Sequence, residues 1–176
     1  MRKRFILIVV AFVIVSSILL TGTNFYLDML WFKELQVAQV FWTQYLTRWG
    51  MRLGGFLFLF VFLFVNMIFT KRYILSFPNL ALRERLMATG FMSLLTPRRL
   101  TIYIFVGAGI LAYILSGYAG NYWMELLRFL NQVTFNISDP VFGTDVAFYV
   151  FRLPFYRFIY GFLMMALVIN IIVIGA

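Results

Sequence analysis

The chain has 176 residues, of which 64% are hydrophobic, 20% aromatic and only 12% charged. Such a composition leaves too little polar surface to cover a soluble domain, so we expect lipid to be the solvent of the fold. A formal net charge of +9 would suggest a nucleic-acid partner for a soluble protein. Here the cations flank apolar stretches, where they orient membrane spans and meet anionic lipid headgroups, and no nucleic-acid partner is expected.

The chain contains neither Cys nor His. A disulfide framework, a thiolate nucleophile, a His base and a His-containing metal site are therefore excluded within it. The remaining residues form no recognisable catalytic constellation and no cofactor motif. The sequence thus leans away from an enzyme and predicts no cofactor.

Four long apolar stretches predict an all-α fold, a polytopic bundle of transmembrane helices. A β-barrel would alternate apolar and polar residues in segments of about ten, whereas residues 56–65 read FLFLFVFLFV and are apolar on every face. Each stretch, with its flanks, comes near the roughly 20 apolar residues that a bilayer core requires. The predicted spans cover about residues 5–22, 53–70, 100–117 and 155–176.

The first of these spans has an alternative interpretation. A basic start, Arg2-Lys3-Arg4, followed by a short apolar core also describes a cleaved secretory signal peptide. The candidate cleavage motif is Thr21-Gly22-Thr23, and Thr is a poor residue at a cleavage position. We therefore favour an uncleaved signal anchor with its amino terminus in the cytoplasm.

The connections between the spans differ strongly in charge. The amino terminus and residues 71–99 together hold nine basic residues and one acid, whereas residues 23–52 and 118–154 with their flanks hold six basic residues and five acids. Because Lys and Arg accumulate on the untranslocated side of short loops, residues 71–99 are predicted to be cytoplasmic and the other two connections outer. The last span lacks a basic inner flank, so we expect the chain to be truncated at its C-terminus, a fragment of a longer protein.

Two connections contain helical patterns. Apolar residues recur at helical spacing between Tyr26 and Trp49, which predicts an interfacial helix that runs into the second span. A second interfacial helix is predicted from Asn79 to Leu95, with Pro97 separating it from the third span. Both would lie in the plane of the membrane surface.

Small residues within the spans predict helix packing. Gly50 and Gly54 form a GxxxG pattern at the outer end of the second span. Small residues also recur every four positions along the third span and just beyond it: Ala108, Ala112, Ser116 and Gly120. Such residues let helix backbones approach closely, within one chain or across a homodimer or another membrane subunit.

Two asparagines lie within the predicted spans. Asn66 and Asn170 follow Arg52 and Arg157 by 14 and 13 residues, so both are expected at similar depth. We predict a hydrogen bond between them. No span carries a charged residue near its centre, which disfavours an ion path through this part of the protein.

The connection before the last span is rich in turn-forming residues. Asp139-Pro140 predicts one turn and Gly143 permits another, and VAFYVF then reads as a short extended or interfacial piece ended by Pro154. Asp139 and Asp145 could also form a calcium pair. Two carboxylates are too few ligands for that ion, so turn capping and pairing with Arg152 or Arg157 are the favoured roles.

This connection, DPVFGTDVAFYVFRLPF, and the earlier LDMLWFKELQVAQVFWTQYLTRWGMRL resemble uncharacterised protein family 0182, large integral membrane proteins of bacteria. The resemblance implies several amino-terminal spans before a large extracytoplasmic domain, in the bacterial cell membrane. It supplies no substrate or catalytic residue. Members often carry Gly after the WFKEL-like stretch, where this chain has Gln36-Val37. The motif positions are Asp139, Pro140, Phe142, Gly143, Asp145, Phe148, Tyr149, Phe151, Leu153 and Pro154.

Two classes of function fit these observations. The first is a non-catalytic membrane module that anchors and positions an outer domain, favoured by apolar spans and the lack of catalytic groups. The second is part of a transporter or channel whose site lies in spans outside this chain. A membrane enzyme is a weaker third, since only outer carboxylates and arginines could serve it.

Overall fold

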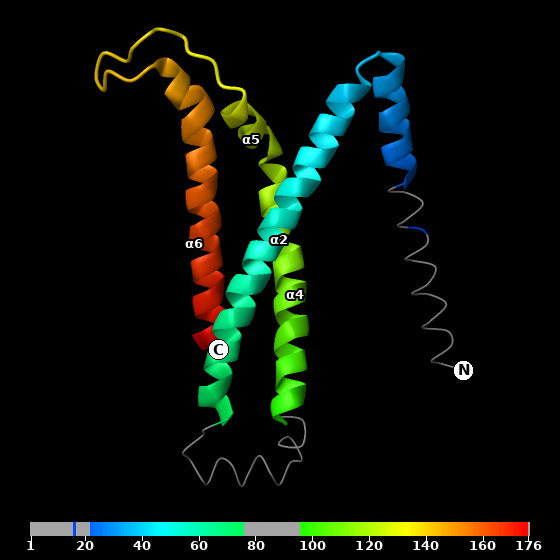
Figure 1. Ribbon diagram of the computed structural model, residues 1–176, viewed down its shortest axis with the longest axis vertical. Coiled ribbons are helices and arrows are strands. Elements are labelled where there is room, and N and C mark those ends of the chain that lie inside the picture. The colour runs from blue at the N-terminus through cyan, green and yellow to red at the C-terminus, as the bar shows by residue number, and fades with distance from the viewer. Residues whose placement is uncertain (1–15, 17–21, 76–95, 176) are drawn as a thin grey trace. The chain divides into compact units, whose positions relative to one another are not determined.

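The computed structural model describes residues 16, 22–75 and 96–175. Two units are separate, residues 1–46 and residues 47–176. Residues 22–34 are helical. The labelled elements that follow are α2 (Ala38–Leu75), α4 (Pro97–Asn121), α5 (Trp123–Leu130), the π-helical turn η2 (Phe148–Arg152) and α6 (Leu153–Gly175) (Figure 1).

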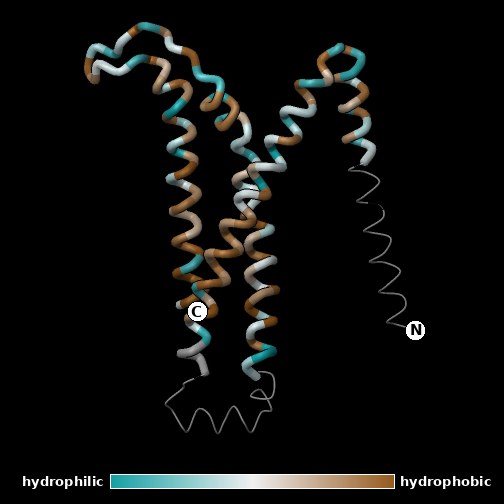
Figure 2. Tube along the Cα trace, viewed as in Figure 1, coloured by the Kyte–Doolittle hydropathy of each residue, from teal (hydrophilic) through white to brown (hydrophobic). Residues whose placement is uncertain are grey.

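The predicted all-α class is confirmed for the described residues. Their β-structure is limited to an isolated bridge between Ser138 and Asp145. Three helices are long and apolar enough to cross a membrane: Ala38–Lys71, Pro97–Asn121 and Phe148–Gly175. Figure 2 shows hydrophobic residues along much of α2, α4 and α6. They contain the second, third and fourth predicted spans, whereas nearly all of the first span, and all of the predicted helix from Asn79 to Leu95, fall outside the described residues.

The predicted helix from Tyr26 to Trp49 is interrupted, which corrects the sequence interpretation. Residues 22–34 end in a turn at Gln36, whose φ is 60°, and α2 begins at Ala38. The amide of Val37 donates to the carbonyl of Phe32, and the amide of Gln36 donates to that of Lys33, both at 3.0 Å. These two bonds are those of a Schellman cap, in which the residue at positive φ is usually Gly. Gln36 therefore adopts a backbone conformation that Gly adopts more readily.

Aromatic rings hold this turn closed within the first unit. Phe25, from the first helix, lies 5.3 Å from Phe41 and 5.0 Å from Tyr45, measured between ring centroids. Phe32 lies 5.6 Å from Phe41. Phe41 is buried. The two helical segments thus pack against each other through rings in edge and stacked contacts, which stabilise beyond simple area burial.

In the second unit, α2, α4 and α6 pack against one another. Rings join α2 to α4 at Phe60 and Phe105 (5.2 Å), and α2 to α6 at Phe58 and Phe162 (5.7 Å). The rings of Tyr118 and Phe158 join α4 to α6 at 6.2 Å. The core consists mainly of small and aromatic residues: Leu59, Ala112, Ala119, Phe158, Phe162 and Ala166.

The two ends of this unit differ in character. At one end the ammonium group of Lys71 on α2 donates a 2.7 Å hydrogen bond to the hydroxyl of Thr101 near the start of α4. We call this the basic end. At the other end, which we call the loop end, residues 131–147 connect α5 to η2 (Figure 1). Near its C-terminal end α2 contacts the start of α4, through Lys71 and Thr101, and in its N-terminal half it contacts Gly120 at the other end of α4. The two helices therefore run antiparallel.

The segment VAFYVF is helical, so its interpretation as an extended piece ended by Pro154 is wrong. Val146 and Ala147 are helical, η2 follows, and Pro154 lies in the first turn of α6. The amide of Leu153 donates to the carbonyl of Phe148, a five-residue step. A proline ring clashes with the carbonyl four residues before it in a regular α-helix. A π-turn is one of the irregularities that relieve such a conflict, and here it directly precedes the proline.

Candidate functional site

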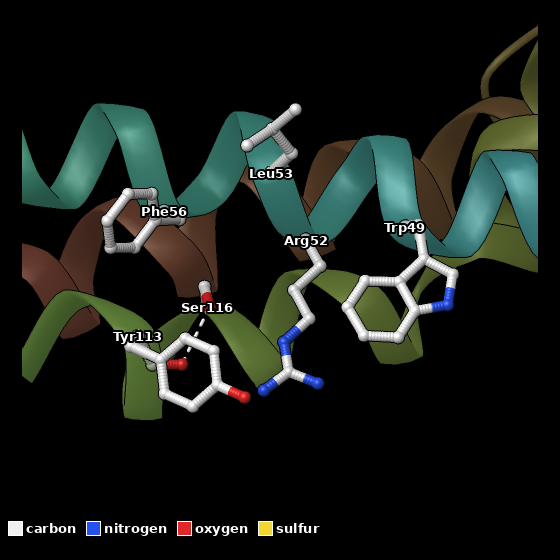
Figure 3. A pocket seen from close by; sticks show the side chains of 6 residues that line it. All are labelled: Trp49, Arg52, Leu53, Phe56, Tyr113 and Ser116. Carbon is white, nitrogen blue, oxygen red and sulfur yellow. Dashed lines mark hydrogen bonds between the residues drawn. The ribbon is translucent and has the colours of Figure 1, made fainter. Parts of the chain in front are cut away.

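Arg52 lies between two helices at the loop end. On α2 the residue follows Trp49 by three positions, which places both side chains on one face. The guanidinium carbon is 5.3 Å from the centre of the Trp49 ring and 4.8 Å from that of Tyr113 on α4. Figure 3 shows the Arg52 side chain reaching from α2 toward α4 beside both rings. Attraction between the cation and the two π-systems holds it there.

Gly120 makes room for the stem of this arginine. A Cβ added at Gly120 would lie 3.3 Å from the Cβ of Arg52 and 3.5 Å from the backbone oxygen of Arg48. The lack of a side chain at this position lets α2 and α4 approach closely. Gly120 was predicted as a packing residue, and its contact with Arg52 could not be anticipated from the sequence.

Arg52 also lines a cavity of about 150 Å³. Its walls are largely apolar and include Leu53 and Phe56 from α2. Ser116 also lines it, but its hydroxyl donates a 2.8 Å hydrogen bond to the carbonyl of Tyr113 on its own helix (Figure 3). The Nε atom of Arg52 is buried and has no hydrogen-bond partner among the described residues. The Arg52 side chain thus lines a small apolar cavity, and its buried Nε donor is left without a partner among the described residues.

Asp145 organises the connection between α5 and η2. Its carboxylate accepts hydrogen bonds from the amides of Ala147 (2.8 Å), Asn136 (3.0 Å) and Phe135 (3.3 Å). These bonds lower the pKa of Asp145, with the bond from Ala147 as the largest cause. One carboxylate therefore ties the start of this connection to its end.

Asp139 closes the turn between those two arms. Its carboxylate accepts from the amide of Val141 at 2.7 Å, and its backbone carbonyl accepts from Gly143 at 2.8 Å. The Val141 amide lowers the pKa of Asp139, as does the hydrogen bond from the hydroxyl of Tyr149. Gly143 has a φ of 63°, a left-handed conformation that glycine adopts easily because it has no Cβ. The predicted turn at Asp139-Pro140 and the capping role of both carboxylates are confirmed.

The other two predicted roles of these carboxylates, pairing with an arginine and binding calcium, gain no support. Arg152 donates through Nε to the side-chain oxygen of Gln132 rather than pairing with an aspartate. Across the part of the chain that the structure describes, no group of three His, Cys, Asp or Glu side chains is placed to hold a metal ion. Asp145 accepts from backbone amides, and Asp139 accepts from the amide of Val141 and the hydroxyl of Tyr149.

The stripe on α4 lies where the sequence predicted it, in the helix interface. Ala108, Ala112 and Ser116 are fully buried, and Gly120 is buried with them. The GxxxG pattern on α2 is different. Gly50 and Gly54 are exposed, and a Cβ at either would meet nothing within 4 Å. The prediction that Gly50 and Gly54 pack against another described helix is therefore wrong. Their contact with another span or subunit stays a prediction.

The close approach on α2 is made by Gly55, which sequence reasoning missed. A Cβ at Gly55 would lie 2.7 Å from the Cβ of Ala119 and 3.5 Å from the ring of Phe162. On α6, a Cβ at Gly161 would lie 3.0 Å from the hydroxyl of Tyr118. The alternation of small residues across all three helices explains how they pack so closely.

The predicted hydrogen bond between Asn66 and Asn170 is absent. The amide group of Asn66 donates instead to the carbonyl of Phe62, one turn earlier on α2, at 2.7 Å. The side-chain oxygen of Asn170 is buried and accepts no hydrogen bond from any described residue. Similar depth along two helices does not place two side chains on facing sides, so the depth argument was insufficient.

A larger cavity, of about 500 Å³, lies at the basic end between α2, α4 and α6. Residues such as Met67, Leu100, Tyr103 and Ile174 line it. The hydroxyl of Thr101, which accepts from Lys71, also donates to the carbonyl of Pro97 at 2.9 Å. These bonds give the basic end a polar link between two spans.

Nearly the whole chain matches a known protein family. The model of uncharacterised protein family UPF0182 matches residues 5–176. The chain belongs to this family. A UPF0182 protein of Moorella thermoacetica is 37% identical over 159 residues, and one of Geobacter sulfurreducens is 32% identical over 181 residues. No solved structure matches.

These UPF0182 relatives are far longer than the chain. The alignments cover 88% and 99% of this chain but only 17% and 20% of the two relatives. The chain therefore corresponds to less than a quarter of a full-length relative. In this UPF0182 chain the loop part of the motif (Asp139 to Asp145) forms the pinned turn, and the remainder, Phe148 to Pro154, forms η2 and the start of α6.

Proposed function

We propose that this region is a membrane module that anchors a UPF0182 protein and positions the part of the protein outside this chain. The supporting observation is the set of three candidate spans, of 34, 25 and 28 residues, joined through apolar and small residues. Helices in lipid associate through close packing of this kind. The module would hold the remainder at the surface of a bacterial cell membrane.

The proposed orientation places the basic end in the cytoplasm and the loop end outside. Lys71, Arg98 and Arg99 flank the described spans at the basic end, and positive charge favours the cytoplasmic side. Anionic headgroups of that leaflet are the lipid partner proposed for these residues. The turn between Asp139 and Asp145 then presents Val141 and Phe142, which are 78% and 74% exposed, to the outer side.

Cysteine labelling tests the orientation. The chain contains no Cys, so single cysteines introduced at Thr144 and Ser93 in the full-length protein provide two reporters. An impermeant maleimide applied to intact cells is expected to label Thr144→Cys and to label Ser93→Cys only after lysis. If only Ser93→Cys is labelled in intact cells, the orientation is the reverse of the one proposed.

A replacement experiment tests the anchoring role. An unrelated helical anchor of the same orientation replaces this region in the full-length protein. Anchoring predicts that the rest of the protein stays in the membrane fraction and resists limited proteolysis as before. If the rest becomes protease-sensitive while still in the membrane, the helices do more than anchor it, as in a transporter or channel.

A further inference from the structure

The position of Arg52 along α2 sets its depth in a membrane. Lys71 follows it by 19 residues on the same helix, and residues 53–70 carry no charge. At about 1.5 Å per residue the two cations are roughly 28 Å apart along the helix axis, close to the ~30 Å of a bilayer hydrocarbon core. If Lys71 lies at one boundary of the core, Arg52 lies at the other, at the level of lipid phosphates.

The guanidinium group of Arg52 has aromatic neighbours, but not all of its N–H donors have hydrogen-bond partners. Trp49 and Tyr113 interact with its π-face. A guanidinium group carries five N–H donors in one plane, and the buried Nε donor has no partner among the described residues. No described carboxylate forms an ion pair with Arg52. An anion that accepts hydrogen bonds in the plane of the group would complete the site.

A second cation strengthens this requirement. Arg48 lies one turn earlier on α2 and is exposed. Like charges four residues apart on a helix repel each other by a few tenths of a kcal/mol. An anion held at Arg52 would offset that repulsion, so the local charge favours a negatively charged ligand.

The surroundings of the site suit a lipid. Leu53 and Tyr113, which line the cavity, are more than half exposed. At four-residue steps along α2 from Leu53 toward the basic end, Leu57 and Val61 are also apolar and exposed. An anionic headgroup at Arg52 could therefore continue into an acyl chain along an apolar surface.

We propose that Arg52, held between Trp49 and Tyr113, binds the phosphate of a membrane phospholipid at the loop end of the bundle. Arginine forms paired hydrogen bonds with phosphate oxygens, and its planar group can stack on aromatic rings at the same time. The apolar cavity that Arg52 lines accommodates part of the lipid next to the phosphate. This site is independent of the anchoring role and of the direction in which the bundle is inserted.

Native mass spectrometry of the full-length protein with phosphatidylglycerol tests the proposal. Arg52→Gln is expected to weaken binding about tenfold, in keeping with loss of a charge-assisted hydrogen bond. Arg128→Gln removes the same charge from an exposed position on α5 and is the matched control; it should leave binding unchanged. An equal loss in both variants, or no loss in Arg52→Gln, would overturn the site.

Two further measurements keep the test decisive. Arg52→Lys retains the charge without the planar fork and is expected to bind more weakly than the wild type, and it replaces Arg52→Gln if the latter does not fold by circular dichroism. Inorganic phosphate at millimolar concentration should not displace the lipid. If it does, the site binds free phosphate and the assignment to phospholipid is wrong.

Discussion

Gly55 on α2 lies so close to Ala119 on α4 that a Cβ added at Gly55 would be 2.7 Å from the Cβ of Ala119. Real Cβ atoms do not approach so closely, so any side chain at Gly55 must push the two backbones apart. The neighbouring Gly54 has nothing within 4 Å of its added Cβ. Adjacent glycines on one helix therefore make opposite predictions for the same substitution.

Gly55→Ala is expected to destabilise the bundle by about 1–3 kcal/mol, as overpacking does in protein cores. Gly54→Ala should be neutral or stabilise by up to about 1 kcal/mol, because Ala favours the helix. Unfolding of both variants in detergent micelles, followed by circular dichroism, provides the comparison. Equal stability of the two variants would show that α2 and α4 do not meet at Gly55.

Gln36→Gly is expected to stabilise the turn between the first described helix and α2. Gln36 adopts a φ of 60°, which costs a residue with a Cβ about 1 kcal/mol relative to Gly. Hydrogen exchange of the amides of Gln36 and Val37 should slow in the variant. Gln44→Gly, the same change inside α2, should instead speed local exchange, since Gly destabilises a helix interior by about 1 kcal/mol. Faster exchange at the turn in Gln36→Gly would contradict the assigned conformation.

The connection that contains Asp145 is expected to loosen in acid. The folded pKa of Asp145 is lowered by the amides that it accepts from, so the carboxylate stabilises the connection above its unfolded pKa of about 3.9. That contribution is lost as the pH falls through the lowered folded pKa. Hydrogen exchange of Phe135, Asn136 and Ala147 between about pH 6 and pH 2, corrected for intrinsic rates, should show protection lost at the acidic end.

Substitution separates the two aspartates. Asp145→Asn should reduce protection of those three amides at every pH and remove its acid dependence. Asp139→Asn should act on the amide of Val141 instead, because Asp139 accepts from that group. Acid loss at Phe135 that persists in Asp145→Asn would assign it to another group.

Thr101→Val is expected to weaken the link between α2 and α4 at the basic end. It removes the acceptor of the 2.7 Å bond from Lys71, at a cost of about 1 kcal/mol in unfolding free energy. Thr70→Val is the control, because among the described residues the Thr70 hydroxyl bonds the carbonyl of Asn66 on its own helix; a change within about 0.5 kcal/mol is expected. An effect of Thr70→Val as large as that of Thr101→Val would show that the interhelical bond contributes little.

The sequence predicted features that depend on composition or on local chemistry. Charge-free runs located three spans, and Asp139 and Gly143 predicted their turn because short polar side chains and glycine favour it. The stripe on α4 was found because its spacing of four marks one face. On α2 apolar residues surround the helix, so nothing distinguished the face of Gly55 from that of Gly54.

The site at Arg52 was missed for a related reason. In the sequence Arg52 reads as a charge that flanks a span, and the spacing from Trp49 to Arg52 is the one local signal that both share a helix face. Tyr113 is 61 residues away, and only the packing of α4 brings it near. The pairing of Asn66 with Asn170 failed similarly, because depth in a membrane says nothing about the direction in which a side chain points around its helix.

The wide turn of η2 before Pro154 sets the rotational phase of α6. A π-turn amounts to one extra residue in an α-helix, and each residue turns the helix by about 100°. Without the extra residue, Phe158, Phe162 and Ala166 would be turned by about 100° from the side that meets α2 and α4. The segment that begins as a family motif in the loop thus ends as the spacer that selects which side of the last helix is inside.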